Sequence, residues 1–556
     1  MRAVRSRGRS LITACKLLPL AAVEMPTAAR THELSFFTSP RGNGMAARSV
    51  LCALLVGITV WAGKAVLIST FATSVPFNDQ WDAEAELLYA PLVRSQFSWH
   101  AIVTPHNEHR IVPTQLLNVA LFELNGRRWE PRLQMLVSAA IHAACFALLA
   151  AWCLSRIPSR PWRFVFVVAL LVLGVVPFSY ENTLWGFQSQ IYFCLLFGLM
   201  ACWGAGFHRP NTARWWLGII CALLAMFSFG GGALTGIALI VAALIPALTE
   251  KNVHAVRRST LLGGLGMLLL GLVARSTITQ QDALGCGDWL TFAFAILRLL
   301  SWPVPIYWWA GIVVWAPLGI LTVRILTGRE PKGSSPLPVA VVLAAFAGAN
   351  ILAVAFFRGN DVARLDISPR YQDVLAVGTI ANLLGLIALL SRTPIRWKRA
   401  THYVAAIWVI LVAGCVIARG VSLSTTMLPF WRQAGIEQAT RLRSFLDATD
   451  DSGREESLRN TTFWQRGYPD AERLASILRT AGLRAALPRV LQGKETETRP
   501  HPLETVLESV LASAKAVFAI ALIALVVVLC LPSNLGNCGS INFALPGSLR
   551  AVRRSA

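Results

Sequence analysis

The chain has 556 residues, of which 55% are hydrophobic and 14% charged, with a formal net charge of +22 and a mean hydropathy of +0.55. Soluble proteins carry about 25% charged residues, so this composition excludes the soluble, disulfide-rich, fibrous and disordered classes. The basic residues stand in short clusters between apolar runs, as in the cytoplasmic loops of membrane proteins, which argues against a nucleic-acid partner. We therefore predict an all-α polytopic membrane protein in a lipid bilayer.

The first 46 residues are basic and irregular, so we expect a cytoplasmic tail or a start codon set too far upstream. Apolar runs of about 20 residues follow, each long enough to cross a hydrocarbon layer of ~30 Å. About twelve spans are expected, at 47–72, 131–155, 163–180, 187–206, 214–229, 232–248, 260–275, 304–326, 337–357, 371–390, 402–420 and 511–531. Alternate loops carry the Lys and Arg clusters, which indicates that both termini, including a tail at 532–556, are cytoplasmic. The expected location is a bacterial inner membrane.

The other side of the membrane receives the loops with the most polar side chains. We expect these outer loops of the membrane domain, residues 47–420, to hold the catalytic groups, at 73–130, 181–186, 276–303 and 358–370. Within the third loop, Trp289 to Trp302 is amphipathic and is expected to lie along the interface. Residues 421–510 have a soluble composition and are expected to form a small accessory domain before the last span, 511–531.

The first outer loop begins with Phe77-Asn78-Asp79-Gln80-Trp81-Asp82, just past the first span. A carboxylate at the membrane surface beside Phe77 and Trp81 is partly desolvated, so Asp79 is a candidate general base. The alternative is that Asp79 caps the helix expected to begin near Trp81, with Asp82 complementing the helix dipole. Asp82 is kept as a substrate-binding candidate, although the role at the helix start suits it better.

Five polar side chains follow one another later in the same loop, after a proline: His106, Asn107, Glu108, His109 and Arg110. They suit a hydrogen-bonding platform for a polar substrate, and Glu108 is the candidate for a second catalytic carboxylate. His106, Glu108 and His109 could hold a divalent cation together with Asp79, but their spacing matches no closed zinc site. We therefore predict no metal site and no other cofactor, with a divalent cation as the open alternative.

The second outer loop combines aromatic and polar side chains at the mouths of two spans: Glu181, Asn182, Trp185 and Gln188. Aromatic faces beside carboxylate and amide groups suit a sugar, because its CH face stacks while its hydroxyls need donors and acceptors. An interfacial aromatic belt would explain Trp185 alone. It leaves Glu181 unexplained, because a polar group so near the hydrocarbon is a functional candidate.

Arg370 and Tyr371 open a span at the expected outer surface, against the positive-inside trend. A guanidinium there can grip a phosphate with two hydrogen bonds, and the alternative is an ion pair with Asp366 or Asp373. Lys64 lies inside the first span, about two turns from its outer end. Snorkelling to the interface is the preferred interpretation for Lys64, and neutralising a lipid phosphate is the other.

Residues 45–420 resemble the GT-C superfamily of membrane glycosyltransferases, which includes protein O-mannosyltransferases and bacterial lipid-sugar transferases. The resemblance rests on the order of spans and loops, and on Phe77-Asn78-Asp79-Gln80-Trp81, His106-Asn107-Glu108-His109-Arg110 and Ser368-Pro369-Arg370-Tyr371. It implies that Asp79 is the catalytic base or positions substrate, that the donor is a sugar on a polyprenyl phosphate, and that Arg370 faces its phosphate. The acidic doublet common in that family is replaced here by Asp79-Gln80.

The expected function is transfer of a sugar from a polyprenyl phosphate to a glycan, lipid or protein acceptor at the outer face. Direct attack assisted by one base inverts the anomeric centre. Two alternatives stay open: a lipid-linked polysaccharide polymerase, ligase or flippase, and a secondary transporter. Transporters place their charged groups at the membrane midplane, whereas the polar groups expected in mid-span here are sparse, chiefly His142 and Asn350.

Overall fold

A computed structural model describes residues 40–250, 252–276, 285–304, 307–327, 336–391, 393–459, 461–492 and 501–531. The chain divides into two units, Met1–Gly44 and Met45–Ala556, and only residues 40–44 of the first are described. Most of the tail expected over 1–46, the whole tail expected over 532–556, and part of the loop expected over 276–303 therefore lie outside the described residues. Everything below concerns the second unit.

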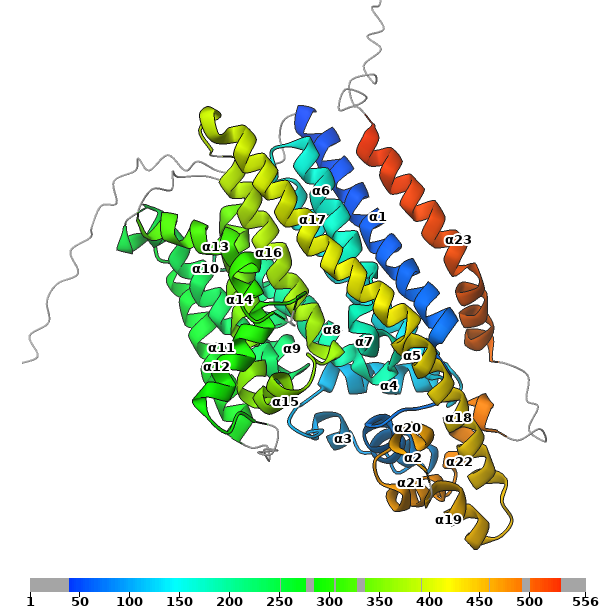
Figure 1. Ribbon diagram of the computed structural model, residues 1–556. Helices are drawn as coiled ribbons and strands as arrows, with labels where there is room; N and C mark the ends of the chain where they lie inside the picture. The colour runs from blue at the N-terminus through cyan, green and yellow to red at the C-terminus, as the bar shows by residue number, and fades with distance from the viewer. Residues whose placement is uncertain are drawn as a thin grey trace, which may run out of the picture. The chain divides into compact units, whose positions relative to one another are not determined.

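Within the described ranges this unit is all-α, and its one β-type contact is the isolated bridge between His106 and His109. Ten helical segments are long and apolar enough to cross a membrane, and Figure 1 shows long helices running side by side. The prediction of a polytopic helical membrane protein is confirmed. The expected spans at 214–229 and 304–326 coincide with the shorter apolar helices Ala213–Met226 and Ala310–Leu326, so a count of twelve stays a prediction.

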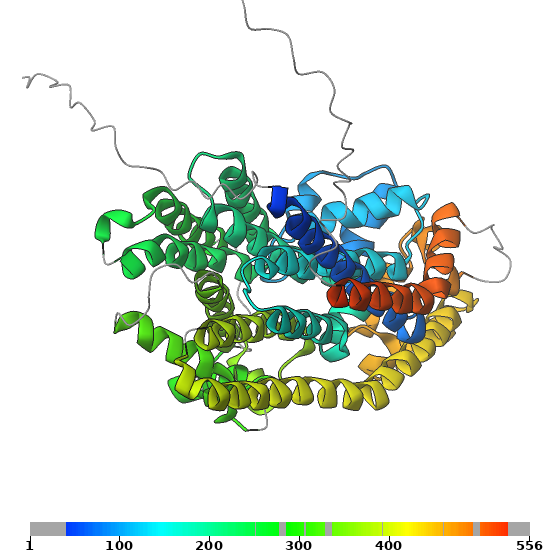
Figure 2. The ribbon, with the colours of Figure 1, turned by 90° about the horizontal axis from the view of Figure 1, so that it is seen from above.

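The long helices follow the apolar runs closely. They are α1 (Pro40–Phe71), α5 (Pro131–Leu154), α6 (Arg160–Val175), α8 (Ser189–Phe207), α9 (Ala213–Met226), α10 (Thr235–Glu250), α11 (Arg258–Ser276), α12 (Trp289–Leu300), α13 (Ala310–Leu326), α14 (Leu337–Phe357), α16 (Gln372–Leu390), α17 (Ile395–Thr425), α18 (Met427–Asp447) and α23 (Pro502–Cys530). Seen from above, α17 and α18 follow one another along one edge of the bundle (Figure 2).

Short helices connect the long ones. They are η1 (Trp81–Tyr89), α2 (Ala90–Val93), α3 (His100–Val103), α4 (Val112–Leu124), η2 (Pro177–Ser179), α7 (Tyr180–Leu184), η3 (Gly186–Gln188), η4 (Gly230–Leu234), η5 (Val253–Ala255), α15 (Gly359–Arg364), η7 (Pro369–Tyr371), α19 (Asp451–Arg459), α20 (Phe463–Arg466), α21 (Ala471–Leu478), α22 (Leu483–Ala486) and η8 (Arg489–Leu491).

Burial separates central from peripheral helices. The span containing α16 is 94% buried, whereas the spans containing α11 and α23 are each 17% buried. A helix that is apolar on every side and enclosed by protein belongs to the bundle centre, and one with an exposed apolar surface faces lipid. The start of α16, which carries Arg370 and Tyr371 in η7, is therefore anchored to the best-packed helix of the membrane domain.

The segments 73–130 and 427–491 form a layer of short helices at one end of the bundle, here named the loop end (Figure 1). One hydrophobic cluster joins the two segments, with Leu88, Tyr89 and Phe122 of the first and Leu442 and Leu474 of the second. The region expected as an accessory domain at 421–510 thus shares its core with the first outer loop.

A buried carboxylate stands inside this layer. Glu84 of η1 is fully buried and accepts hydrogen bonds from Gln80 Nε2 (3.2 Å), Gln134 Nε2 (2.6 Å) and Tyr89 Oη (3.0 Å). Burial disfavours the charged form more than these hydrogen bonds favour it, so the pKa of Glu84 rises from 4.5 to about 7.

We expect Glu84→Gln to flatten the pH dependence of thermal stability. The folded-state pKa of Glu84 lies above the unfolded value, so its stabilising contribution is complete below about 4.5 and is lost as pH rises through about 7. A shift of this size corresponds to about 3 kcal/mol. Unfolding temperatures of the detergent-solubilised protein, read from tryptophan fluorescence at about pH 5 and about pH 8, measure the effect. Glu472→Gln, at an exposed position, is the control, and parallel curves for wild type and Glu84→Gln would contradict the expectation.

Candidate functional site

Three separate segments of the chain meet around Asp79 at the loop end. His106 Nε2 lies 4.0 Å from Asp79 Oδ1, and the Arg370 guanidinium is close enough to act on the Asp79 carboxylate electrostatically. Arg370 Nε in turn lies 3.3 Å from Glu181 Oε2, and the guanidinium carbon stands 5.7 Å from the centre of the Trp185 ring. Five of the side chains singled out in the sequence therefore form one group.

Asp79 is held by a turn that is fixed on both sides. Asn78 has a φ of 47°, which asparagine tolerates better than most residues. Its N–H donates to the Gly467 carbonyl (2.6 Å), and Trp185 Nε1 donates to the Phe77 carbonyl (2.9 Å). The residue at the N-cap of η1 is Gln80, and no side chain makes a cap hydrogen bond there. The alternative that Asp79 caps this helix is therefore wrong.

The electrostatics of the pair suit proton transfer. The Asp79 side chain is 22% exposed and that of His106 is 13% exposed. Burial raises the pKa of Asp79, although His106 and Arg370 partly oppose the rise. Burial also lowers the pKa of His106, against the attraction of Asp79. A partly accessible carboxylate with a raised pKa is a stronger base than an ordinary surface aspartate.

The polar run after Pro105 forms a tight hairpin. The backbones of His106 and His109 exchange hydrogen bonds of 2.8 and 3.0 Å, and Asn107 at the tip has a φ of 48°. Asn107 Nδ2 lies 3.1 Å from His106 Nε2. Glu108 points elsewhere, because it is buried in an ion pair of 3.1 Å with Arg358 Nη2. The expected second catalytic carboxylate is thus not among the charged groups that act on Asp79.

The remaining members of that run surround a different cavity. His109 and Arg110 line it together with Arg275. Burial and the nearby arginines lower the pKa of His109 to about 3, so its ring is neutral. Across the described ranges, no group of three His, Cys, Asp or Glu side chains is arranged to hold a metal ion.

Asp82 makes a contact within the loop-end layer. Tyr468 Oη donates to Asp82 Oδ1 (2.7 Å), and Arg473 Nη2 lies 2.9 Å from the same oxygen. These bonds connect the first outer loop to α21 and to the segment that precedes it. Asp82 also stands in the first turn of η1, as its expected helix-dipole role requires.

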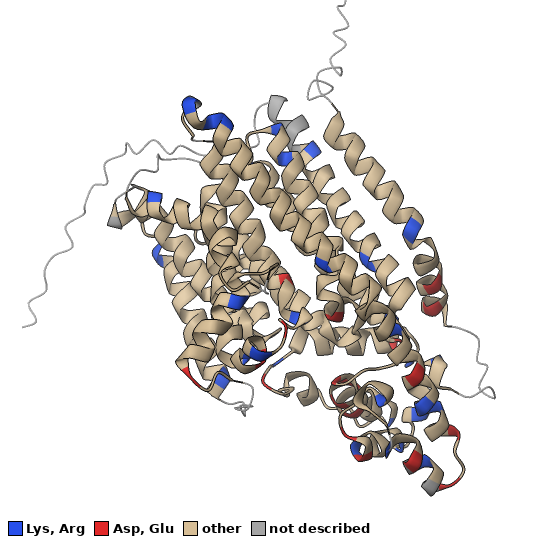
Figure 3. Ribbon diagram, in the orientation of Figure 1, with Lys and Arg blue, Asp and Glu red and all other residues tan. Residues whose placement is uncertain are grey.

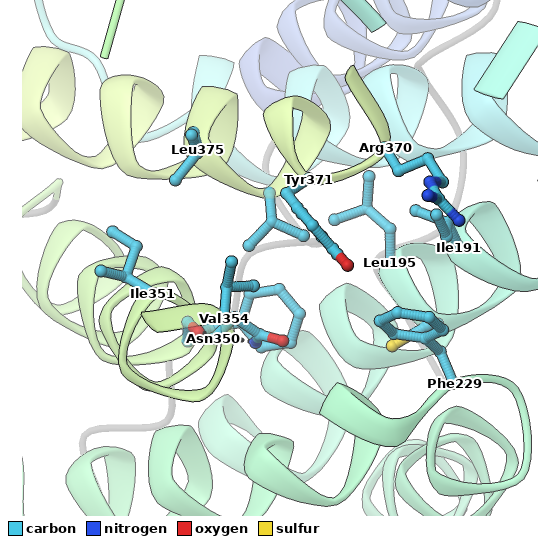
Figure 4. Close-up of a pocket in the computed structure, with 12 residues that line it drawn as sticks. Ile191, Leu195, Phe229, Asn350, Ile351, Val354, Arg370, Tyr371 and Leu375 are labelled. Carbon is cyan, nitrogen blue, oxygen red and sulfur yellow. Dashed lines mark hydrogen bonds between the residues drawn. The ribbon is translucent and has the colours of Figure 1, made fainter. Parts of the chain in front are cut away.

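An apolar pocket opens beneath Arg370 and Tyr371 (Figure 4). Its walls come from α8, α14, α16 and Phe229, and they enclose a cavity of ≈ 20 Å³. Both side chains extend from η7 toward the pocket in Figure 4. The lining residues are Ile191, Cys194, Leu195, Phe229, Phe346, Asn350, Ile351, Val354, Arg370, Tyr371, Val374 and Leu375. A cation at the mouth of an apolar pocket suits a phosphate that carries a hydrocarbon chain.

A buried polar network lies under this group, inside the membrane-spanning helices. Asp373 accepts hydrogen bonds from Ser179 Oγ (2.9 Å) and Asn182 Nδ2 (2.8 Å), and His142 Nε2 lies 3.3 Å from its Oδ1. Asn182 Nδ2 also donates to the Arg370 carbonyl (3.0 Å). The network therefore joins the segment of Glu181 to the segment of Arg370, which gives Asn182 a positioning role.

Lys64 lies near this network. Its side chain is fully buried, its Nζ has no hydrogen-bond partner among the described residues, and its charge acts on Asp373 electrostatically. The preferred interpretation, snorkelling, is therefore wrong. Arg370 pairs with Glu181, so the alternative of an ion pair with Asp366 or Asp373 is wrong; Asp366 is bound to Arg419 (2.7 Å) instead. Gln188 is buried and neither amide atom has a hydrogen-bond partner in the described structure.

Sequence reasoning gave too little weight to Asp373 and Lys64. The available signal was an acidic residue in the first turn of one span and a lysine inside another, since ionisable groups at such depth are normally paired. What the sequence could not give was the rotation of each helix. Rotation decides whether the two side chains face the bundle centre or the lipid.

We expect Asp373→Asn to destabilise the fold strongly, because it leaves the Lys64 ammonium buried without its counter-charge. Breaking a buried pair costs about 3–5 kcal/mol. The measurement is the unfolding temperature in detergent for Asp373→Asn, Lys64→Met and the double variant. The double variant should recover most of the loss, because no unpaired charge remains. Strictly additive effects of the two single changes would show that the residues are not coupled.

Comparisons of this chain with family models, curated proteins and solved structures gave no match. The chemistry of the site has to be judged from its own geometry.

Proposed function

We propose that this protein is a membrane glycosyltransferase that moves a sugar from a polyprenyl-phosphate donor to an acceptor hydroxyl. The observation that supports this best is that Arg370, which lines an apolar pocket, acts electrostatically on the Asp79 carboxylate. Transfer from a lipid phosphate needs a base for the acceptor and positive charge for the leaving phosphate. The site provides both next to apolar side chains of the membrane-spanning helices.

In the proposed reaction, Asp79 takes the proton of the acceptor hydroxyl as its oxygen attacks the anomeric carbon. The bond between that carbon and the phosphate oxygen breaks, and the polyprenyl phosphate leaves with the electron pair. Arg370 binds the phosphate and stabilises its charge, while Glu181 and the Trp185 ring hold the guanidinium in orientation. A single displacement inverts the anomeric centre. This assignment needs neither a metal ion nor Glu108.

The acceptor side is proposed to lie against an aromatic group next to Asp79. Phe77 is at its centre, with ring centroids 5.4 Å from Trp185, 5.1 Å from Trp431 and 5.9 Å from Trp464. Stacked and edge-on rings suit the CH face of a sugar. Because Trp431 and Trp464 come from the 421–510 region, that region would shape the acceptor site without supplying the base.

The proposal places the loop end outside the cytoplasm, in a bacterial inner membrane. Figure 3 shows Asp and Glu together with Lys and Arg among the short helices of the loop end, whereas the opposite ends of the long helices show Lys and Arg. The turn between α5 and α6 lies at the opposite end, where Arg156 in the turn and Arg160 and Arg163 in the first turn of α6 are found. An excess of Lys and Arg marks the cytoplasmic side of a membrane protein.

The test is a transfer assay with the purified full chain in vesicles and a panel of polyprenyl-phosphate hexoses and pentoses labelled in the sugar. We expect label to leave the donor in an Asp79-dependent manner. The buried group of Lys64, His142 and Asp373 favours one rival, a secondary transporter, because charged residues within spans often mark ion pathways. No transfer with active control enzymes, together with proton-driven solute uptake into proteoliposomes, would favour that rival.

A further inference from the structure

A second cationic side chain has buried donors without partners. Arg275 stands in the last turn of α11, with its guanidinium carbon 4.5 Å from the centre of the Phe357 ring. Its Nη1 donates to the Glu108 carbonyl (3.3 Å), whereas Nε and Nη2 are buried and have no hydrogen-bond partner. Buried donors without partners are costly, and here they stand beside a cavity.

This cavity is separate from the pocket beneath Arg370. It has a volume of ≈ 50 Å³, several times the ~10–15 Å³ that one water needs. Arg275, Arg110, His109 and Glu108 line it above apolar side chains that include Met226 and Phe227. Glu108 is the one carboxylate among the lining residues, and Arg358 neutralises it at 3.1 Å. The lining therefore favours an anion.

The surroundings of Arg275 point to a lipid as the source of that anion. Leu269, Leu272 and Val273, in the turns that precede Arg275, are exposed. The span containing α11 is only 17% buried, so its apolar surface faces hydrocarbon in a bilayer. A head group that reaches Arg275 along this surface leaves its chain in the hydrocarbon. A phosphate matches the guanidinium and sits at that depth in a lipid.

The hairpin His106–His109 connects this cavity to the site of Asp79. His106 faces Asp79. His109 lines the cavity and packs on Phe229, with ring centroids 4.4 Å apart. Phe229 also lines the pocket beneath Arg370. The hairpin thus lines one cationic pocket and contacts, through Phe229, the wall of the other.

We infer that the cavity at Arg275 binds the phosphate head group of a second lipid, distinct from the one held at Arg370. This inference rests on the proposed function, and it identifies the sugar acceptor as a lipid-linked phosphate compound. Its chain lies along α11, and its head group reaches past the hairpin toward Asp79. The Arg275 guanidinium supplies two hydrogen bonds from Nε and Nη2.

The test measures binding of radiolabelled farnesyl phosphate to the purified full chain in detergent by equilibrium dialysis. We expect two sites in the wild type. Arg275→Gln should weaken one of them by about 10- to 100-fold, as expected for the loss of charge-assisted hydrogen bonds, and Arg370→Gln should weaken the other. Arg258→Gln, at the exposed opposite end of α11, should change neither. Farnesol and inorganic phosphate serve as competitors that test whether the site recognises a lipid phosphate or only one of its parts. Neither should displace farnesyl phosphate at equal concentration.

Unchanged binding in a monodisperse Arg275→Gln protein would overturn the inference, whether or not transfer is observed. Equal competition by inorganic phosphate would overturn the assignment to a lipid. Two binding sites for farnesyl phosphate without any sugar transfer would instead support the lipid site at Arg275 and count against the proposed function. If Arg275→Gln fails to fold, Arg275→Lys replaces it in the test. Lysine keeps the positive charge but lacks the two parallel hydrogen-bond donors of the guanidinium. Weakening of one site in that variant supports the inference, and unchanged affinity overturns it.

Discussion

Replacing Asp79 by Asn should slow sugar transfer by about 10²–10⁴-fold, the usual contribution of a general base. The substitution keeps the shape of the side chain and removes its ability to accept the proton. Asp79 makes no cap hydrogen bond, and the turn that carries it is fixed by backbone bonds of Asn78 and Phe77. The fold and the binding of the donor should therefore change little.

The pH–rate profile of the wild type gives an independent readout of the same prediction. The base must be deprotonated, and burial raises the pKa of Asp79 above its ordinary 3.8. Activity should therefore rise with pH along an acid limb that lies above that value. Asp366→Asn, at an exposed carboxylate paired with Arg419, is the matched control and should keep both rate and profile. Wild-type turnover in purified Asp79→Asn protein would transfer the role of base to Glu181.

Much of the fold could be predicted because apolar length fixes where a helix crosses and at what depth its ends emerge. Asp79, Glu181 and Arg370 each lie close to a span end on the same side. Their meeting at the loop end follows from the alternation of the spans. Which of them form pairs does not follow from the sequence, because pairing depends on the rotation and tilt of the helices that carry them.

The misplaced residues show which information the sequence lacks. The depth of Lys64 along α1 suggested that its side chain could reach the interface. The side chain is instead fully buried, and its charge acts on Asp373. Glu108 follows His106 by only two residues in the same polar run, but the turn at Asn107 leaves His106 beside Asp79 and Glu108 paired with Arg358. The core shared by segments 73–130 and 427–491 joins residues more than 300 positions apart, and no local pattern indicates such a contact.

Replacing Arg370 by Ala should weaken donor binding by about 100-fold, and by Lys about 10-fold. A hydrogen bond to a charged group contributes about 1.5–3 kcal/mol, and each 1.4 kcal/mol changes affinity tenfold. Lys keeps the charge but loses the planar fork that grips a phosphate. It also loses the orientation that the Trp185 ring gives the guanidinium.

The Arg370 substitution also removes the partner of Glu181, whose side chain is only 18% exposed. The double variant Arg370→Ala with Glu181→Gln separates the two effects, because it removes the unpaired carboxylate as well. If Arg370 holds the donor phosphate, donor affinity stays low in the double variant, and KM for the donor rises more than kcat falls. Arg419→Ala removes another guanidinium of the same bundle, bound to Asp366 at 2.7 Å, and should leave KM unchanged. Recovery of wild-type affinity in the double variant would mean that Arg370 only neutralises Glu181, and the phosphate would then have to be held elsewhere.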